Sequence, residues 1–352
     1  MFRNATRAVG ALAAAAAAVA LAATPALADP SGYRSLTGTG SDTTQYVMGG
    51  LADVIGGGTV IGSYDAIGST TIQTRSGGPT FARPNGSGNG VRALTASINP
   101  TGGYTYSNGS GGQVAINGQL DFARSSSGPS AAGTDLTYIP FARDAVSYAY
   151  SNWGTASAPS YLTVAELAAI YRGTLTTFRS ADGVTREYLP RLPQTGSGTR
   201  QFFLQQIGVS EAEVHWITGL VQENDGSEID SIGEIVPFSV ASWVAQNNNV
   251  VPNTVVDNDV VLGAIDDDYW GVVAPVWHGK LNSVFPINRL VYNVVQTSRL
   301  SGTSPADLLL QQTFAGSGSS VCQNASVINQ YGFGTIANCG NTTTYKSGYV
   351  AP

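Results

Sequence analysis

Segments with helical periodicity alternate along this chain with short runs of β-branched and aromatic residues. Apolar residues three and four apart predict helices within residues 42–56, 86–98, 162–173 and 196–208. Strands are predicted at residues 137–151, 234–244 and 283–295, and the first and last of these are long, apolar and contain proline. Segments 103–118 and 315–320 are rich in Gly, Ser and Asn and are predicted to be loops. This alternation is typical of α/β proteins rather than of β-sandwiches, so the predicted fold class is α/β.

Residues 1–28 have the composition of a secretory signal peptide. Arg3 and Arg7 precede a run of Ala, Val and Leu, which ends in the small-residue sequence Ala26-Leu27-Ala28. A membrane anchor is the competing interpretation, but Pro25 interrupts the apolar run. We therefore expect cleavage after Ala28 and a secreted, extracellular protein. Because the cleavage site has no nearby cysteine, we expect no lipid anchor on the membrane.

The charge balance argues against nucleic acid as a partner. The chain has a formal net charge of −6, and removal of Arg3 and Arg7 would change it to −8. A nucleic-acid-binding protein needs a basic surface instead.

The length of the chain predicts two lobes. About 324 residues would remain after cleavage, which is more than a single hydrophobic core usually contains. We expect a monomer.

Two cysteines, Cys322 and Cys339, lie near the C-terminus. In an exported protein such a pair predicts one disulfide. A metal site is not predicted, because the cysteines lack C-x-x-C spacing and the two histidines, His215 and His278, stand far apart in the sequence. No cofactor is predicted either.

Three glycine-flanked polar segments precede predicted helices and share one pattern. They are Thr37-Gly-Thr-Gly-Ser-Asp42, Asn85-Gly-Ser87-Gly-Asn89 and Thr195-Gly-Ser197-Gly-Thr199. The N-terminus of a helix has unpaired backbone N–H groups and a partial positive charge, so it favours an anion. Serine at such a position is more commonly a helix cap. Three of these segments in one chain nevertheless predict an anion-binding site, provided that the fold brings them together.

With these segments in this order, the chain resembles the phosphate-binding proteins of phosphate ABC importers, and in particular secreted actinobacterial proteins similar to them. The resemblance covers most of the chain after the signal peptide. The segments that carry it, in order, are LTGTGSDTTQYV (36–47), GSGNGVRAL (86–94), LDFARSSSGP (120–129), LTVAELAAIYRGTLTTF (162–178), TGSGTRQFF (195–203), VPFSVASWV (236–244) and FPINRLVYNVV (285–295).

The resemblance implies a class II periplasmic-binding-protein fold. In this fold two α/β lobes, each a mixed sheet flanked by helices, are joined by two hinge strands and close on the ligand. The implied crossings between the lobes fall near Ile139-Pro140 and Phe285-Pro286. Lobe one is then residues 33–139 with 286–352, and lobe two is residues 140–285.

The resemblance also implies site residues. Ser87 matches the serine of the second segment, and Ser197, Gly198 and Thr199 match the Ser-Gly-Thr phosphate loop of the family. Three positions depart from the family pattern. Asp42, followed by Thr43, replaces a threonine, Ser126 replaces an aspartate, and Pro193 stands where an arginine is expected. Arg124 is the first candidate for the missing cation, ahead of Arg143 and Arg200.

Asp42 has two interpretations. As a ligand-binding carboxylate it would accept a hydrogen bond from a proton on phosphate, whereas sulfate has no such proton to donate. Alternatively, its side chain caps the helix that follows.

The leading functional hypothesis is a secreted binding protein for inorganic phosphate or a related oxyanion, which serves phosphate uptake without catalysis. An ABC importer permease is then a candidate partner. An extracellular interaction or glycan-binding protein that kept the fold but lost phosphate is the alternative. A phosphatase or esterase is disfavoured, because the chain has no G-x-S-x-G motif and a triad would depend on His215 or His278.

Overall fold

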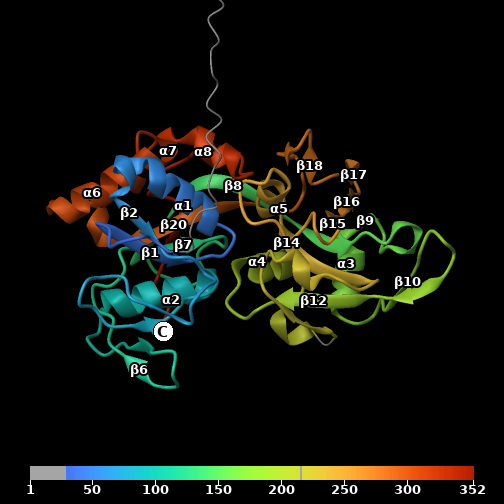
Figure 1. Ribbon diagram of the computed structural model, residues 1–352, viewed down its shortest axis with the longest axis horizontal. Coiled ribbons are helices and arrows are strands. Elements are labelled where there is room, and N and C mark those ends of the chain that lie inside the picture. Colours follow the sequence, from blue (N-terminus) through green and yellow to red (C-terminus); the bar gives the residue numbers. More distant parts are fainter. Residues whose placement is uncertain (1–28, 215) are drawn as a thin grey trace, which may run out of the picture.

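The computed structural model describes residues 29–214 and 216–352 and shows two lobes side by side (Figure 1). The predicted signal peptide and His215 lie outside the described residues. A large mixed sheet runs through both lobes in the strand order β13-β12-β14-β8-β20-β7-β1-β2. The α/β class and the two-lobed architecture predicted from the sequence are confirmed.

Lobe one contains the parallel strands β1 (Leu36–Gly40), β2 (Ile61–Ser63) and β7 (Phe122–Ser125). Helices α1 (Gln45–Val54) and α2 (Ser87–Ile98) follow the first and second glycine-flanked segments. The C-terminal helices α6 (Pro305–Phe314), α7 (Ser320–Gln323) and α8 (Ala325–Gln330) belong to this lobe (Figure 1). Its minor strands are β3 (Thr71–Ile72), β4 (Phe81–Ala82), β5 (Tyr106–Ser107), β6 (Gln113–Val114) and β21 (Lys346–Ser347).

Lobe two contains β12 (Leu189–Pro193), β13 (Gly219–Val221) and β14 (Glu234–Ser239), with helices α3 (Val164–Tyr171), α4 (Gly198–Gln206) and α5 (Val240–Asn247). Strand β15 (Val260–Leu262) pairs with the end of β8. A smaller sheet combines β9 (Tyr161–Leu162), β16 (Ala264–Asp267) and β17 (Gly271–Val273). Two hairpins complete the lobe: β10–β11 (Thr177–Arg179, Thr185–Glu187) and β18–β19 (Val276–Trp277, Lys280–Leu281).

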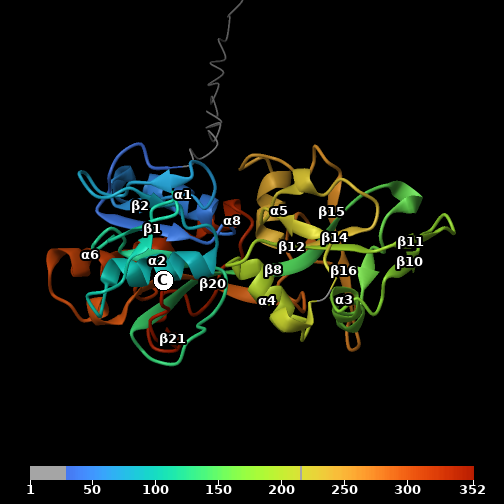
Figure 2. The ribbon, with the colours of Figure 1, turned by 90° about the horizontal axis from the view of Figure 1, so that it is seen from below.

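Two antiparallel strands, β8 (Leu136–Ser151) and β20 (Asn288–Gln296), connect the lobes (Figure 2). The first part of β8 pairs with β20, and from Val146 onward β8 pairs with β14 and β15. Phe141 and Ala142 pack in a core of lobe one, whereas Ala145 and Val146 pack in the core of lobe two. The predicted crossing at Ile139-Pro140 precedes this change of core, and the proposed lobe boundaries stay a prediction.

The helix predictions agree with the structure, including the capping box in which Thr163 and Glu166 cap α3 reciprocally. The strand prediction for residues 234–244 is wrong in its second half. The chain turns into helix α5 after Ser239, whose hydroxyl accepts a hydrogen bond from the Ser242 N–H as the N-cap. Apolar spacing alone did not separate the two, because both the strand and one face of the helix are buried.

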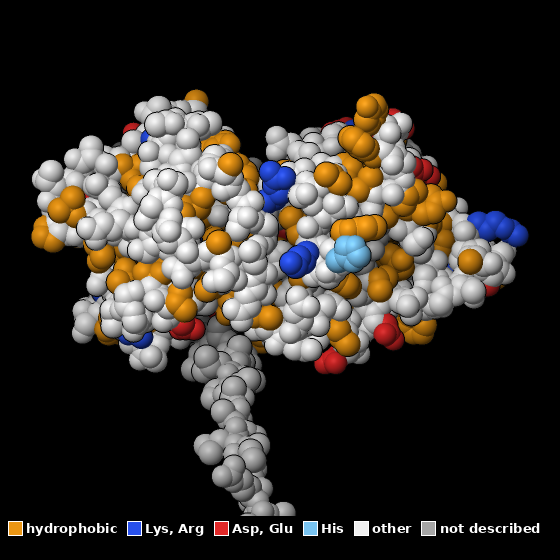
Figure 3. All heavy atoms as spheres, turned by 90° about the horizontal axis from the view of Figure 1, so that it is seen from above, with side chains coloured by type: hydrophobic (Ala, Val, Ile, Leu, Met, Phe, Trp, Pro, Cys, Tyr) orange, Lys and Arg blue, Asp and Glu red, His pale blue; other side chains and the backbone are white. Residues whose placement is uncertain are grey.

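Cys322 and Cys339 form the predicted disulfide. Among the described residues, no helix is long and apolar enough to cross a membrane. Charged side chains are sparse on the face drawn in Figure 3, where uncharged polar groups and backbone predominate. This agrees with a chain in which only 11% of residues are charged.

Candidate functional site

The second and third glycine-flanked segments meet between the lobes. The Gly88 N–H, in the first turn of α2, donates to the Gly196 carbonyl just before α4, at 3.0 Å. Gly198 packs directly against Ser87 and Ser126, and a Cβ atom at this position would collide with both hydroxyls. A glycine is therefore required where the lobes touch.

Ser87 and Ser126 form a buried pair on the lobe-one side of this contact. Their hydroxyl oxygens are 3.2 Å apart, and the Ser126 N–H donates to Ser87 Oγ at 2.9 Å. The family resemblance implies an aspartate at the position of Ser126, and here Ser126 lies beside Ser87 and Gly198. The structure thus brings together three of the residues singled out in the sequence.

Thr43 and Thr199 form a second contact between the lobes. Their Oγ1 atoms are 3.1 Å apart, and both side chains are buried. Arg289 on β20 donates through Nη2 to Thr199 Oγ1 at 2.8 Å and to Thr43 Oγ1 at 3.2 Å. One guanidinium group therefore holds two hydroxyls from different lobes.

Arg289 was not among the cations proposed from the sequence, although it lies in the segment FPINRLVYNVV. Its side chain is 2% exposed and forms an ion pair with the fully buried Asp144 at 2.8 Å. Its Nη1 atom is buried without a hydrogen-bond partner. The one signal in the sequence was a charged residue at the start of a long apolar strand, and a buried cation in such a strand needs a partner.

In the described structure, none of the three arginines proposed from the sequence donates a hydrogen bond to these threonine hydroxyls. Arg124 is fully buried behind the first loop, where it donates to the carbonyls of Ser41 and Tyr64. Burial lowers the pKa of Arg124 to about 10. Arg143 donates to the Ser283 carbonyl, near the junction of the lobes.

Arg200 forms an ion pair with Glu211. In the same turn of α4, Ser197 is the N-cap, because its hydroxyl accepts a hydrogen bond from the Arg200 N–H at 3.1 Å. The cap interpretation therefore applies to Ser197.

Asp42 does not cap helix α1, whose N-cap is Thr44. Its carboxylate instead accepts hydrogen bonds from the side-chain amides of Gln45, at 3.0 Å, Asn224, at 2.9 Å, and Gln222, at 3.3 Å. The last two belong to lobe two, so Asp42 also bridges the lobes. Burial, and next the nearby Glu223, raises the pKa of Asp42 well above its ordinary value.

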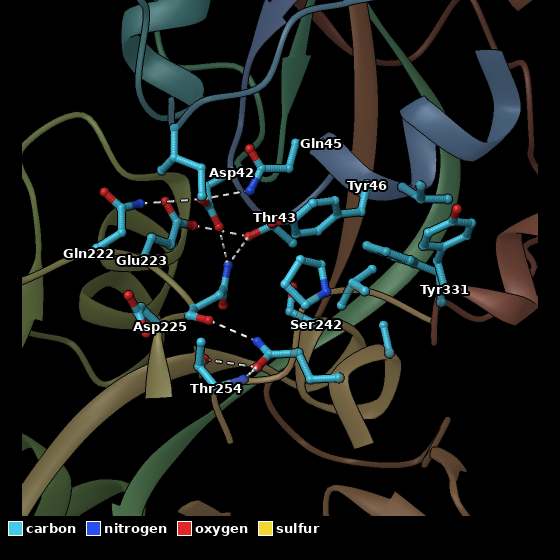
Figure 4. Close-up of a pocket in the computed structure, with 18 residues that line it drawn as sticks. Asp42, Thr43, Gln45, Tyr46, Gln222, Glu223, Asp225, Ser242, Thr254 and Tyr331 are labelled. Atoms are coloured by element: carbon cyan, nitrogen blue, oxygen red, sulfur yellow. Dashed lines mark hydrogen bonds between the residues drawn. The ribbon is translucent and has the colours of Figure 1, made fainter. Parts of the chain in front are cut away.

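Two cavities lie next to the residues described above. The larger, of about 360 Å³, is lined by the N-terminal residues of α2 and α4 and by Arg92, Arg200 and Glu211. The smaller, of about 130 Å³, lies between α1, α5 and the loop after β13. Figure 4 shows Asp42, Gln222 and Glu223 at one end of the smaller cavity and Tyr331 at the other.

The loop Gln222–Asp225 was missed in the sequence analysis. Glu223 accepts a hydrogen bond from Thr43 Oγ1 at 3.0 Å, and Gln222 accepts one from Asn85 at 2.9 Å. These residues follow a short strand without a glycine pattern, so nothing in their spacing indicated the site. Within residues 29–214 and 216–352, no cluster of His, Cys, Asp and Glu has the geometry of a metal site.

The sequence of residues 27–272 matches the family model described as the PBP superfamily domain. No curated protein matches the chain. Solved structures do match its fold. One is of a putative phosphate ABC transporter substrate-binding protein with bound phosphate from Clostridium perfringens, with a TM-score of 0.53 and 15% identity over 86% of this chain and 99% of that one. Another is of an ABC-type phosphate transport receptor from Vibrio cholerae, with a TM-score of 0.52 and 14% identity over 86% of this chain and 100% of that one.

Proposed function

Since the chain belongs to the PBP superfamily, we propose that it is a solute-binding protein which holds inorganic phosphate or a related oxyanion between its two lobes. The family and the fold are those of substrate-binding proteins, which carry out no catalysis. The two structures named above come from proteins whose descriptions specify phosphate transport. At about 15% identity they support the fold, and the ligand must be argued from the residues of this chain.

One observation carries the proposal: the N-termini of α2 and α4 open onto the same cavity of about 360 Å³. Ser87 and Gly88 contribute from the first helix, and Gly196 and Ser197 from the second. Two helix N-termini that converge on one space supply positive potential from both lobes, which favours an anion. Arg92, Arg200 and Glu211 line the same cavity, and because Glu211 pairs with Arg200, the three side chains together leave one formal positive charge.

The neighbouring hydroxyls support the same ligand class. Ser87 contacts Ser126 within lobe one, and Thr43 contacts Thr199 across the contact between the lobes. In this structure these hydroxyl groups therefore hydrogen-bond to each other. An oxyanion that entered as the lobes separated would replace hydroxyl–hydroxyl contacts with charge-assisted hydrogen bonds, which are roughly twice as strong. We assign Thr43, Ser87, Ser126, Ser197, Gly198 and Thr199 to the proposed site, with Asp42 at its edge.

Calorimetry with phosphate, arsenate, sulfate, phosphate monoesters and neutral sugars tests the proposal. We expect binding of phosphate or a related oxyanion. Ser87→Ala and Thr199→Val should each weaken it by roughly 1.5–3 kcal/mol, because each removes one charge-assisted hydrogen bond. Ser107→Ala, on strand β5 and outside the lining of the cavity, is the control. Absence of oxyanion binding, or equal binding by all three variants, would contradict the proposed site.

We further propose that the protein works outside the cytoplasm and delivers its ligand to an ABC importer permease. The motivation is the predicted signal peptide at residues 1–28, together with the family. Intact mass of protein collected from the medium should correspond to a chain that begins at Asp29. A chain that retains residues 1–28 would contradict the predicted cleavage.

A second candidate function is extracellular interaction or glycan binding without phosphate. It is favoured by three exposed aromatic residues in lobe two. Tyr269 and Trp270, in the turn between β16 and β17, are 84% and 70% exposed, and Trp277, on β18, is 66% exposed. Exposed aromatic rings are common in binding surfaces. If the calorimetric series shows binding of neutral sugars and not of oxyanions, this second candidate replaces the first.

A further inference from the structure

The smaller cavity, of about 130 Å³, combines an acidic end with an apolar body. Asp42, Glu223 and Asp225 contribute carboxylates, whereas Tyr46, Val251, Pro252, Tyr331 and Phe333 contribute apolar surface. The volume is enough for several water-sized groups. In Figure 4 the labelled acidic residues lie apart from Tyr331.

The lining of the cavity supplies no counter-ion to its acidic end. Asp42 and Glu223 are 4% and 2% exposed, and the described lining of the cavity contains no Lys, Arg or His. Arg289 contacts Thr43 nearby, but its ion pair is with Asp144. Buried carboxylates are normally paired with a cation or held by several hydrogen bonds.

Glu223 is the less satisfied of the two acids. Its Oε1 atom accepts a hydrogen bond from Thr43, whereas its Oε2 atom is buried and has no hydrogen-bond partner. Asp42 accepts three amide hydrogen bonds, which leaves one of its usual four acceptor positions open. A ligand that complements this end must therefore donate hydrogen bonds and carry positive charge.

We propose that this cavity is a binding site for a small primary alkylammonium ion, next to the proposed oxyanion site, whose residues Thr43 and Asp42 also line the cavity. The ammonium group donates to Glu223 Oε2. Its alkyl chain lies against the aromatic and aliphatic side chains between α1 and α5. Inorganic cations lack this apolar body, and the described residues offer no cluster suited to a metal ion.

Calorimetry at pH 7.5 with propylammonium tests the proposal, with 1-propanol as the neutral isostere and with potassium and tetramethylammonium as cation controls. We expect propylammonium to bind at least tenfold more tightly than any of the three. Equal binding of 1-propanol would show that only the apolar body contributes. Equal binding of potassium or tetramethylammonium would show that hydrogen-bond donation by a primary ammonium is unimportant, and either result overturns the proposal.

Three variants place the site. Glu223→Gln keeps the size of the side chain but removes its charge, and should weaken propylammonium binding at least tenfold. Ser242→Leu fills the cavity from α5 without changing a carboxylate, and should have a similar effect. Glu187→Gln, exposed on β11, should bind as the unmodified protein does. Thermal unfolding of each variant identifies loss of fold. Tight binding by folded Ser242→Leu, or lack of binding by the unmodified protein, would overturn the proposal independently of any result with phosphate.

Discussion

Arg289 and Asp144 are direct partners in the register of the two strands that connect the lobes, and their side chains form a buried ion pair. Asp144 also accepts hydrogen bonds from the Ser239 hydroxyl and the Ala241 N–H, at the start of α5. The pair therefore joins both connecting strands to a helix of lobe two. Arg289 Nη2 also donates hydrogen bonds to Thr43 Oγ1 and Thr199 Oγ1, so the same guanidinium group takes part in the contact between the lobes.

Removal of one partner of this pair should be costly. Asp144→Asn leaves the Arg289 charge buried and unpaired, which typically destabilises a protein by about 3–5 kcal/mol. Chemical denaturation measures the change in the free energy of unfolding. The double variant Asp144→Leu with Arg289→Met removes both charges. It should lose less stability than the single variants Asp144→Leu and Arg289→Met lose in sum. Additive losses would indicate that the two side chains stabilise the fold independently.

Asp42→Asn tests whether this carboxylate selects among oxyanions. With three amide donors already bound, Asp42 has an acceptor position left for a proton on phosphate. We expect the variant to bind phosphate at least tenfold more weakly and sulfate more tightly, because an asparagine amide can donate to sulfate. Competition calorimetry gives the selectivity, and Asp53→Asn, exposed on the same helix, is the control. Unchanged selectivity would leave Asp42 with the structural role of bridging the lobes.

Local sequence patterns were sufficient for much of the fold. The capping box of α3 and the N-cap of α4 follow from interactions within four residues, and both are present in the structure. The segments that contain Ser87 and Ser197 were singled out because a glycine pattern before a helix is also local. The pattern does not give the distance between the two segments, because that distance depends on how the connecting strands β8 and β20 position the two lobes.

The parts of the site that were missed depend on contacts between distant residues. Arg289 lies 246 positions from Thr43, and Glu223 lies 180 positions from it. Glu223 belongs to none of the quoted segments. Arg289 lies in the segment FPINRLVYNVV, but the partner of a charged side chain in an apolar segment cannot be predicted from local spacing. Arg124, the first candidate cation, lies on β7 and donates to the backbone carbonyls of Ser41 and Tyr64, which are 83 and 60 positions away in the sequence. Such long-range contacts are not visible in a local sequence pattern.

The disulfide between Cys322 and Cys339 should stabilise the C-terminal part of lobe one. It closes a chain segment with a sequence separation of 17, for which loop-closure entropy predicts about 3 kcal/mol. Cys322→Ser with Cys339→Ser should therefore lower the midpoint of thermal unfolding by several degrees. The same midpoint in a reducing agent is the matched measurement. If neither treatment changes the midpoint, the loop is held by its packing alone.

The free energy of unfolding should depend on pH through buried acids. Burial raises the pKa of Asp65 to about 7, and Asp42 is raised as well. A raised pKa means that the folded state binds more protons than the unfolded chain between about pH 4 and pH 7. The stability that protonation contributes is therefore fully present below about pH 4, and is lost as the pH rises through about 7. Without ligand, the protein should be more stable at pH 5.5 than at pH 7.5.

Asp65→Asn isolates this contribution. The amide cannot ionise, so the variant should lose the Asp65 part of the pH dependence, and it should be about 1–3 kcal/mol more stable than the unmodified protein at pH 7.5. Asp135→Asn, at an exposed carboxyl group, should leave the pH dependence intact. Urea denaturation at both pH values provides the measurement. Nearby Arg124 opposes the effect by favouring the carboxylate, but burial is the larger influence on Asp65. A variant that is less stable at pH 7.5 would mean that the attraction of Arg124 for the ionised carboxylate outweighs the cost of burying it.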